Sequence, residues 1–575
     1  MSPLLSVRNL SVGFGRDPAA NEVVKGVSFD LAAGETLAIV GESGSGKSVT
    51  ALSINRLVDF GGGRITGGSI TLERDEGSVD ITTADEQALQ RIRGREIGMI
   101  FQEPMTSLNP VHTVGRQIEE AFRLSRGITG RAATLAAKEA LDRVRIPDAA
   151  QRLGYYPHQL SGGMRQRVMI AMVIAPNPRL LIADEPTTAL DVTVQAQIMA
   201  LLAELRAETR MSMIFITHDI GLVAGIADQI MVMQQGVAVE QGLLDAVIDN
   251  PQHDYTKHLL SAVPHFTSGA AVRGDGVRGE SKPPIVKVDS LVVRFPAARG
   301  LFVRTSGAVH AVDGVDFDLR PGETLAIVGE SGSGKSTTAR AILGLTAATR
   351  GQIAVQGQGH RPVQMVFQDP FASLNPRLNV EALLAEPAIA ARQRVDAKLR
   401  ERMAFLLKRV GLTEDALERY PHQFSGGQRQ RLAIARALML NPDVVVLDEA
   451  VSALDVSVQA RVLELLIDLQ REFGLAYLFI SHDMAVVERI AHRIAVMYAG
   501  QLVEIGDAKS VLSAPQHSYT KRLIAAVPAI ERRRQAFKLD NTQVPSLVKP
   551  RGYEPPPARW RDAGPDHRVR VEQAG

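Results

Sequence analysis

The chain has 575 residues, more than a single hydrophobic core usually serves, so its length predicts two or more domains. Hydrophobic residues at 45% and charged residues at 22% are ordinary for a folded protein, and a net charge of only +2 does not indicate a polyanion-binding surface, so no nucleic-acid partner is expected. The chain contains no cysteine, which excludes disulfides, thiolate metal sites and iron–sulfur clusters.

No segment of the sequence predicts export or membrane insertion. The N-terminal MSPLLSVRNLSVGFG lacks a basic stretch followed by an apolar one, so no signal peptide is expected. An uninterrupted run of about 18 apolar residues, as a membrane-spanning helix needs, occurs nowhere. We therefore expect a protein that is cytosolic or peripheral to a membrane.

The first chemical motif along the chain follows a short apolar run. Residues 36–40, TLAIV, are suited to a buried parallel strand, and GESGSGKS follows directly before a helical stretch. This strand–GxxxxGKS–helix order is typical of a phosphate-binding P-loop, whose glycines let backbone N–H groups curl round phosphates. Lys47 is expected to reach the β- and γ-phosphates, and Ser48 to ligate Mg²⁺. The predicted phosphate cradle is Gly41, Gly44, Ser45, Gly46, Lys47 and Ser48.

The second part of a nucleotide site is predicted where the apolar run RLLIAD (179–184) ends. Asp184 is placed to hold Mg²⁺, directly or through water, and Glu185 to polarise an attacking water as general base. A long helical stretch at 192–208 and another buried-strand run, MIFIT (213–217), follow. Alternating strands and helices predict an α/β domain with a mainly parallel sheet.

The second half of the chain repeats the first. Fifteen residues, GETLAIVGESGSGKS, occur at 34–48 and again at 322–336, an offset of 322 − 34 = 288. FQEPMTSLNP (101–110) matches FQDPFASLNP (367–376) at an offset of 367 − 101 = 266. The falling offset indicates a deletion between these motifs in the second copy. The second set of nucleotide-site residues is Gly329, Gly332, Ser333, Gly334, Lys335, Ser336, Asp448 and Glu449.

The domain boundaries follow from the repeat and from composition. The first copy is assigned to 1–265 and the second to 285–530. Between them, residues 266–284 are rich in Gly, Ser, Pro and charge, which is typical of a linker. Residues 531–575, with ERRR, PPP and the only tryptophan, are expected to form a loosely packed extension. The stretch missing from the second copy, beginning ITGGSITLERDEG, predicts an elaborated antiparallel sub-sheet.

Further motifs carry a family resemblance. LSGGM (160–164) and FSGGQ (424–428) closely resemble the signature motif of ABC-type ATPases, and each is followed by RQR on an expected helix. The motifs occur in the same order twice and span nearly the whole chain except the linker and the extension. The remaining family motifs are the Q-loop glutamines Gln102 and Gln368, the D-loops at 189–191 and 453–455, and the switch histidines His218 and His482.

The resemblance implies two tandem P-loop NTPase domains, each with a mainly parallel sheet core, an antiparallel β subdomain and a helical signature subdomain. It implies an ATPase that uses ATP and Mg²⁺. Phe14 and Phe295 stand where the family stacks an aromatic ring on adenine, although either is equally compatible with a core residue. The implied catalytic residues are Glu185, His218, Glu449 and His482, and the implied Mg²⁺ ligands are Ser48, Gln102, Asp184, Ser336, Gln368 and Asp448.

In this family the signature motif faces the P-loop of the opposite domain, so the two halves of one chain are implied to pair around two ATP molecules. The tether raises the effective concentration of each half. Both copies keep the motif Lys, Gln, signature Ser, Asp, Glu and His, which predicts two hydrolysis-competent sites. The second copy departs from the first where Ala450 and Val451 replace Pro186 and Thr187. A local packing change is expected there, and unequal turnover of the two sites stays open. The implied γ-phosphate contacts are Ser161, Gly162, Gly163, Ser425, Gly426 and Gly427.

The segments after the two glutamines resemble those of the oligopeptide/dipeptide importer branch. So do the HPYT-type elements, PQHDYTKHLLSAVP (251–264) and PQHSYTKRLIAAVP (515–528). Lacking the cysteine cluster of many relatives, the chain is most similar to fused ATPases of glutathione- or oligopeptide-type importers. This implies a subunit at the cytoplasmic face of the inner membrane, with two integral-membrane permeases and a solute-binding protein as partners.

Two alternatives remain open from the sequence. A soluble tandem ABC ATPase acting on ribosomes or nucleic acid is disfavoured by the short Gly- and Pro-containing linker and by the absence of zinc-binding cysteines. An importer for a non-peptide solute such as nickel, an opine or a sugar is equally compatible with the ATPase motifs, because the receptor and permeases select the solute.

Overall fold

The computed structural model of the chain divides into two compact units. The structure describes residues 3–102, 107–188, 190–261, 283–296, 307–357, 362–452, 454–528, 545–550 and 552–571. The first unit comprises Met1–Leu190, Val194–Val263 and Pro528–Asp540, and the second comprises Asp191–Thr193, Pro264–Val527 and Asn541–Gly575. The linker predicted at 266–284 lies outside the described residues except for 283–284. Among the described helices, none has the length and apolar character needed to cross a bilayer.

The first unit contains a mainly parallel sheet. Its strands are β3 (Thr36–Val40), β6 (Ile97–Ile100), β7 (Leu180–Asp184), β8 (Ser212–Thr217), β9 (Gln229–Gln234) and β10 (Val237–Leu243). They lie in the order β10-β9-β3-β8-β7-β6, and only β10 joins its neighbour antiparallel. Strands β3, β7 and β8 are buried along their whole length, which confirms the buried parallel strands expected from their apolar runs.

An antiparallel sheet forms the second layer of this unit. It contains β1 (Leu5–Phe14), β2 (Glu22–Leu31), β4 (Gly63–Leu72) and β5 (Val79–Asp80), in the order β2-β1-β4-β5. The elaborated sub-sheet expected after ITGG is therefore present. The same segment adds α2 (Glu86–Ile92), whose first turn is capped by the Asp85 carboxylate. This helix was not predicted, because short β-branched runs, which favour strands, dominate the segment.

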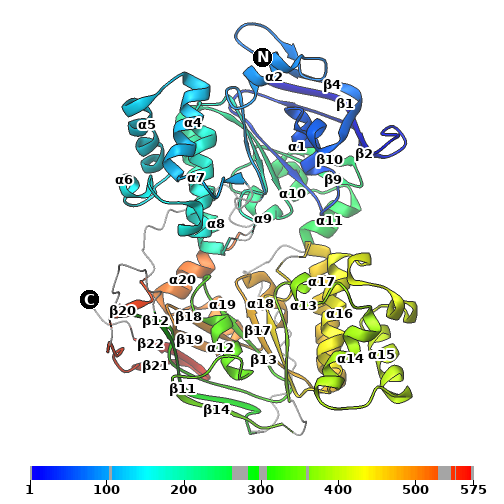
Figure 1. Cartoon of the computed structure of the whole chain (residues 1–575), viewed down its shortest axis with the longest axis vertical. Coiled ribbons are helices and arrows are strands. Elements are labelled where there is room, and N and C mark those ends of the chain that lie inside the picture. The colour runs from blue at the N-terminus through cyan, green and yellow to red at the C-terminus, as the bar shows by residue number, and fades with distance from the viewer. Residues whose placement is uncertain are drawn as a thin grey trace. The chain divides into compact units, whose positions relative to one another are not determined.

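The helices between residues 114 and 174 group together in the first unit, apart from the helices at 47–54 and 86–92 (Figure 1). Helix α1 (Lys47–Ile54) starts at the P-loop, and Ser161 caps α7. The apolar faces of the helical group meet in a core that includes Ile118, Leu141 and Ile170. The other helices are α4 (Val114–Arg126), α5 (Gly130–Arg143), α6 (Ala149–Arg152), α7 (Gly162–Ile174), α8 (Val192–Thr209), α9 (Ile220–Val223), α10 (Leu244–Asp249) and α11 (Asp254–Ser261).

The second unit repeats both layers. Its parallel strands are β13 (Thr324–Val328), β15 (Val363–Val366), β16 (Val444–Asp448), β17 (Ala476–Ser481) and β18 (Arg493–Tyr498), and β19 (Gln501–Asp507) joins antiparallel. The antiparallel layer contains β11 (Val286–Pro296), β12 (Gly307–Leu319) and β14 (Arg350–Val355). The fold therefore confirms tandem α/β domains, and the described part of the shorter copy has no counterpart of β5 and α2.

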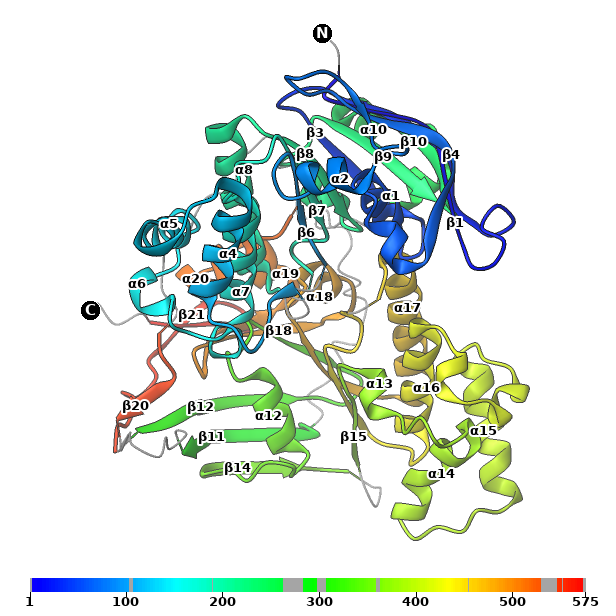
Figure 2. The same ribbon diagram turned by 45° about the horizontal axis from the view of Figure 1, so that its top comes forward.

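The helices of the second unit follow the same order as those of the first. They are α12 (Lys335–Ile342), α13 (Pro370–Ser373), α14 (Val380–Ala390), α15 (Ala397–Arg409), α16 (Gly426–Leu438), α17 (Val456–Phe473), α18 (Met484–Ile490), α19 (Ala508–Ser513) and α20 (Ser518–Ala525). Figure 2 shows α12 beside the antiparallel layer, and α14, α15 and α16 grouped away from it.

The described part of the C-terminal extension, residues 545–550 and 552–571, forms strands that pair with the second unit, contrary to the expected loose packing. Strand β20 (Val548–Pro550) pairs antiparallel with the start of β12, and lies beside it in Figure 2. Strand β22 (His567–Arg570) pairs with β19, and β21 (Trp560–Gly564) pairs with β22. The described part of the extension therefore adds strands to one edge of each sheet of the second unit, and pairs with three residues of β12 and two of β19. Proline-rich, charged composition gave no period-two pattern from which these short strands were predictable.

A buried carboxylate anchors the extension. Glu504 in β19 is 0% exposed and accepts hydrogen bonds from His567 Nε2 over 2.7 Å and from the backbone N–H groups of Gln516 and His517 over 2.8 and 2.9 Å. In the first unit Glu240 accepts the matching bonds from Gln252 and His253 but is only half-buried. A buried carboxylate needs such partners because desolvation is costly.

Replacing His567 by Ala is expected to lower the free energy of unfolding of the second unit by about 1–3 kcal/mol, because Glu504 would stay buried with one partner lost. Calorimetry of the full chain would measure the change. The matched control is Arg561→Ala on exposed β21, expected within about 0.5 kcal/mol of the parent. Equal stability of the two variants would show that the extension is not anchored through Glu504.

Candidate active sites

The first P-loop joins β3 to α1 and is held close to neighbouring backbone. Gly46 has a φ of 98°, and a Cβ on Gly41 would lie 2.2 Å from the Met233 carbonyl oxygen. Lys47 is 4% exposed, and its Nζ donates to the carbonyl oxygens of Gly41 over 2.8 Å and Glu42 over 2.7 Å. The glycines are required because a side chain would collide here or would strain the left-handed backbone.

The second P-loop has the same geometry. Lys335 is also 4% exposed and donates to the carbonyl oxygens of Gly329 and Glu330, each over 2.8 Å. A Cβ on Gly329 would lie 2.1 Å from the Met497 carbonyl oxygen. Burial lowers the pKa of Lys335 although nearby carboxylates oppose the shift. Identical local sequences have therefore produced identical loops in the two units.

A serine and an aspartate meet beside each lysine. Ser48 Oγ donates to Asp184 Oδ1 over 3.0 Å, and Ser336 Oγ donates to Asp448 Oδ1 over 2.9 Å. Burial raises the pKa of Asp184 to about 6, against the opposing hydrogen bond from Ser48. Burial also raises the pKa of Asp448. The effect of burial on these two carboxylates is therefore larger than the opposing effect of their hydrogen bonds and of the nearby positive charges.

Glu185 is the centre of a second contact group in the first unit. It follows β7 with a φ of 44° and accepts hydrogen bonds from Gln102 Nε2 over 2.8 Å and Thr188 Oγ1 over 2.9 Å. Its Oε1 lies 3.4 Å from His218 Nδ1. Burial would raise the pKa of Glu185, but the bond and charge of His218, with Thr188 and Lys47, lower it to about 2. The carboxylate is therefore ionised at neutral pH.

Glu449 repeats this group with one change. Gln368 Nε2 donates to its Oε2 over 2.6 Å, and His482 Nδ1 lies 3.3 Å from its Oε1. Its φ is 48°, and His482 holds its pKa below the ordinary value against the effect of burial. Ser452, which replaces Thr188, donates to the Glu449 carbonyl oxygen over 2.9 Å instead of to the carboxylate. The second glutamate thus has one side-chain contact fewer from this loop.

The departure from DEPTTALD to DEAVSALD changes the local packing, as expected. In the first unit Gln166 Nε2 donates to the Pro186 carbonyl oxygen over 2.5 Å. In the second, the buried Nε2 of the equivalent Gln430 has no hydrogen-bond partner among the described residues. Val451 is 2% exposed and occupies the position of Thr187. The D-loop residues Ala189 and Ala453 lie outside the described residues.

The signature serines cap the helices that follow them. Ser161 Oγ accepts from Met164 N–H over 3.4 Å, and Ser425 Oγ accepts from Gln428 N–H over 3.3 Å. Gln428 returns the bond by accepting from Ser425 N–H over 3.0 Å, a capping box that Met164 cannot form. The second signature glycine of each motif allows close helix packing. A Cβ on Gly163 or Gly427 would lie 2.5 or 2.3 Å from a valine methyl group on the next helix, α8 or α17.

The two predicted adenine-stacking residues differ in exposure. Phe295 at the end of β11 is 41% exposed. Phe14 at the end of β1 is half-buried and packs against the apolar core of the first unit beside Gly63. Phe295 is thus accessible to a base, whereas Phe14 combines a packing contact with partial exposure.

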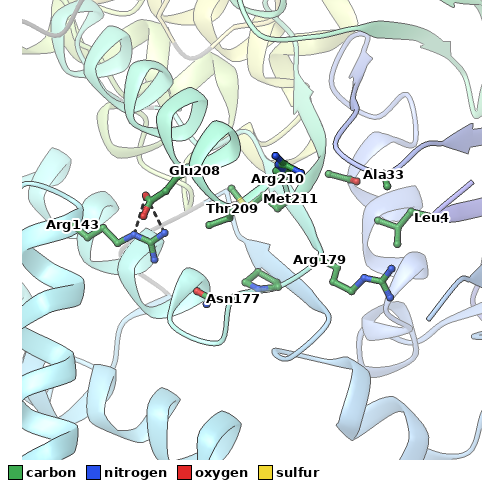
Figure 3. Close-up of a pocket in the computed structure, with 11 residues that line it drawn as sticks. Leu4, Ala33, Arg143, Asn177, Arg179, Glu208, Thr209, Arg210 and Met211 are labelled. Carbon is green, nitrogen blue, oxygen red and sulfur yellow. Dashed lines mark hydrogen bonds and ion pairs between the residues drawn. The ribbon is translucent and has the colours of Figure 1, made fainter. Parts of the chain in front are cut away.

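A hollow of the first unit lies away from this site. It has a volume of about 470 Å³ and is lined by residues that precede β7 and β8, such as Arg179 and Met211. Figure 3 shows Arg143 paired with Glu208 at its rim. Ligands of parallel α/β sheets bind beyond the carboxyl ends of the strands, where the P-loop and Glu185 lie. This hollow is at the amino ends and does not belong to the candidate site.

Comparison with known proteins identifies the class. The family model described as ABC transporter matches residues 24–188 and 312–452, and the model described as oligopeptide/dipeptide transporter, C-terminal region, matches 239–287 and 503–552. The chain therefore belongs to the ABC transporter family as a tandem ATP-binding ATPase, with the transporter C-terminal region after each domain. This confirms the family resemblance and the HPYT-type elements.

Individual proteins of similar length resemble this chain along nearly their whole sequence. The glutathione import ATP-binding protein GsiA of Salmonella paratyphi A is 50% identical over 607 aligned positions, which cover 98% of this chain and 96% of that protein. The GsiA of Escherichia coli is 49% identical, covering 99% of this chain and 97% of its own. That of Pectobacterium atrosepticum is 49% identical, covering 98% and 96%. The similarity spans both ATPase domains and the extension.

Sequence reasoning did not predict two contacts of the site. One is the bond from Thr188 to Glu185, for which a hydroxyl residue three positions after the glutamate is the available signal. The other is made by Tyr255, which the sequence places only in the HPYT-type element but whose hydroxyl reaches the P-loop. The predicted lysines, serines, aspartates, glutamines, glutamates and histidines do come together within each unit.

The contact between Glu185 and His218 predicts that the histidine pKa depends on the glutamate. Burial would lower the pKa of His218, but the hydrogen bond and charge of Glu185 outweigh it and raise the pKa above 6.5. Glu185→Gln is expected to lower the pKa of His218, measured by NMR titration of the imidazole in nucleotide-free protein. The control Glu449→Gln removes the same contact from His482. An unchanged His218 pKa in Glu185→Gln would contradict the pairing.

The same pair is expected to stabilise the first unit within a defined pH window. A raised histidine pKa contributes stability below the unfolded value of about 6.5 and loses it as pH rises through the folded value. Glu185, with its pKa lowered from 4.5, contributes above 4.5 and loses the contribution as pH falls toward about 2. The stability difference between parent and Glu185→Gln should therefore be largest between about pH 4.5 and 6.5 and smaller at pH 9, as measured by thermal unfolding.

Proposed function

We propose that this chain is the ATP-hydrolysing, energy-coupling subunit of an ABC importer for glutathione or for di- and oligopeptides. The observation that carries the ATPase part is that one set of contacts is formed twice, at Lys47, Glu185 and His218 and again at Lys335, Glu449 and His482. The solute class is supported by the relatives named for glutathione import and by the oligopeptide/dipeptide transporter region.

Mg²⁺ is proposed at the serine–aspartate pairs. Ser48 with Asp184 and Ser336 with Asp448 supply hard oxygen ligands, which Mg²⁺ prefers. No group of three or more metal-ligating side chains occurs among the described residues, so phosphate oxygens and water are expected to complete the coordination. The predicted ligands Gln102 and Gln368 donate instead to the catalytic glutamates here. Mg²⁺ would neutralise charge on the phosphates during hydrolysis.

The chain's own residues then divide the chemistry of hydrolysis between them. The lysine amine binds the β- and γ-phosphates, and the ionised glutamate accepts a proton from the attacking water. The histidine, placed 3.4 Å from Glu185 Oε1 in the first unit, orients the carboxylate and reaches toward the γ-phosphate. The positive N-terminal ends of α1 and α12 favour the phosphate charge.

We propose further that the two domains pair head to tail around two ATP molecules. Lys47 would then share a site with Ser425, and Lys335 with Ser161. This arrangement rests on the family resemblance and on the tether, which raises the effective concentration of each domain for the other. The domain boundaries 1–265, 266–284, 285–530 and 531–575 belong to the same proposal.

Two permeases, a solute-binding protein and a place at the cytoplasmic face of the inner membrane complete the proposed assembly. ATP-driven closure of the two domains, followed by hydrolysis and reopening, would drive the permeases to alternate access. The glutamines Gln102 and Gln368 support this coupling because each bonds a catalytic glutamate and is followed by the importer-like FQ segment.

Replacing Glu185 or Glu449 by Gln tests whether both sites turn over. Each single variant is expected to lose at least half of the ATPase rate, and the double variant to lose about 100-fold or more, as for removal of a general base. The measurement is phosphate release at saturating MgATP, with Glu464→Gln on the exposed face of α17 as matched control. A single variant with the parent rate would show that its site does not contribute.

Uptake of labelled glutathione and of dipeptides tests the solute class. The full chain would be reconstituted with two permease subunits and a solute-binding protein. The expected result is uptake of labelled glutathione or dipeptide together with stimulation of the ATPase by the same solute. Both are expected to be lost in the double variant Lys47→Ala with Lys335→Ala. Stimulation only by nickel, an opine or a sugar would reassign the solute, and association with ribosomes without permeases would contradict the importer.

A further inference from the structure

A tyrosine of the HPYT-type element touches the P-loop in both units. The Tyr255 hydroxyl oxygen in α11 accepts a hydrogen bond from the backbone N–H of Glu42 over 3.0 Å. The Tyr519 hydroxyl oxygen in α20 accepts the equivalent bond from Glu330 N–H over 2.9 Å. These partners are 213 and 189 residues apart in the sequence, and each glutamate is the second residue of a GESGSGKS loop. The contact is thus a repeated property of the two domains.

The peptide group that the tyrosine holds is the one that holds the lysine. The N–H of Glu42 and the carbonyl of Gly41 belong to one planar peptide unit. Tyr255 accepts from the N–H, and Lys47 Nζ donates to the carbonyl over 2.8 Å. In the second unit Tyr519 and Lys335 hold the Gly329–Glu330 peptide in the same way. Hydrogen bonds at both ends of a peptide polarise one another and fix its plane.

Tyr255 is held in place by the residues that precede it in the HPYT-type element. Glu240 in β10 accepts from the N–H groups of Gln252 and His253, and His253 Nδ1 accepts from Tyr255 N–H over 3.2 Å. Tyr255 is 9% exposed. The side chain therefore reaches the loop from a fixed helix start.

The second unit anchors its tyrosine more tightly. Glu504 accepts from Gln516 and His517 N–H groups, and His517 Nδ1 accepts from Tyr519 N–H over 3.1 Å. Tyr519 is 2% exposed and stacks on Tyr498, with ring centroids 4.1 Å apart. A Tyr→Phe change keeps this stacking and removes only the hydroxyl, so it isolates the bond to the P-loop.

We propose that Tyr255 and Tyr519 are positioning residues for ATP binding. Each fixes the first peptide plane of its P-loop, so that the carbonyl holds the lysine amine in place before the nucleotide arrives. The transporter C-terminal region then has a function inside its own ATPase domain, as a support of the phosphate-binding loop. The inference rests on nucleotide binding, which is part of the proposed function, but not on the transported solute.

The test uses Tyr255→Phe and Tyr519→Phe in the full chain. The probe is MANT-ADP, which lacks a γ-phosphate and so reports on the P-loop. Binding is measured in chains where the other P-loop is disabled by Lys335→Ala or Lys47→Ala. Tyr255→Phe is expected to weaken binding roughly three- to tenfold in the Lys335→Ala chain, the loss of about one hydrogen bond. Tyr519→Phe is expected to do so in the Lys47→Ala chain.

A control variant distinguishes a specific effect on nucleotide binding from a general loss of fold stability. The matched control is Tyr477→Phe, whose buried hydroxyl donates to the Leu466 carbonyl oxygen over 2.9 Å at the end of β17 away from the P-loop. It should lower the melting temperature without weakening MANT-ADP binding. Folded Tyr255→Phe and Tyr519→Phe chains with parental affinity, or a weakening that Tyr477→Phe matches, would overturn the proposal. A failed glutathione-uptake assay would leave this result unaffected, and a negative result here would leave the transport proposal unaffected.

Discussion

Each domain buries a lysine ammonium group in its P-loop, and the structure around the loop has to stabilise that buried charge. A charge withdrawn from water is costly unless hydrogen bonds replace the lost hydration. Lys47 and Lys335, each 4% exposed, are bonded by two backbone carbonyl oxygens that the glycine-rich loop turns toward the amine. Strand β3 or β13 before the loop and helix α1 or α12 after it hold that loop rigidly. A phosphate bears full negative charge, so the same amine can pair with it more strongly than with a carbonyl oxygen.

The two halves share this arrangement but support it differently. Thr188 bonds the Glu185 carboxylate, whereas Ser452 bonds a backbone carbonyl. The Gln166 amide has a partner that the buried Gln430 amide lacks. The second signature helix has a capping box that the first does not form, and only the second unit gains the strands of the extension. The contacts of the P-loop lysines and serines are thus the same in the two units, and the differences lie in the residues around them.

The C-terminal region of each domain is connected to the nucleotide site by a short series of hydrogen bonds. A β-hairpin glutamate bonds the start of the HPYT-type helix, a histidine caps that helix, and its tyrosine reaches the P-loop. The second unit repeats the series with the glutamate fully buried and additionally bonded to His567 of the extension. Residues from distant parts of the sequence are therefore linked in series to the P-loop of the second domain, with Tyr519 making the direct contact. None of these links depends on the solute transported.

Local patterns in the amino-acid sequence are sufficient to predict the tandem α/β fold, the buried strands and the residues that gather beside each P-loop. Apolar runs such as TLAIV, glycines at fixed spacing and an acidic pair at a strand end are short-range signals, and their repetition removed ambiguity. Helix α2 and the pairing of the extension with β12 and β19 are visible only in the three-dimensional structure. The same holds for the exposure of Phe295 and the packing of Phe14. It also holds for the bonds from Tyr255 and Tyr519 to the P-loops. Such contacts join residues far apart in the sequence, and a single sequence carries no short-range pattern that specifies which distant backbone a side chain will meet.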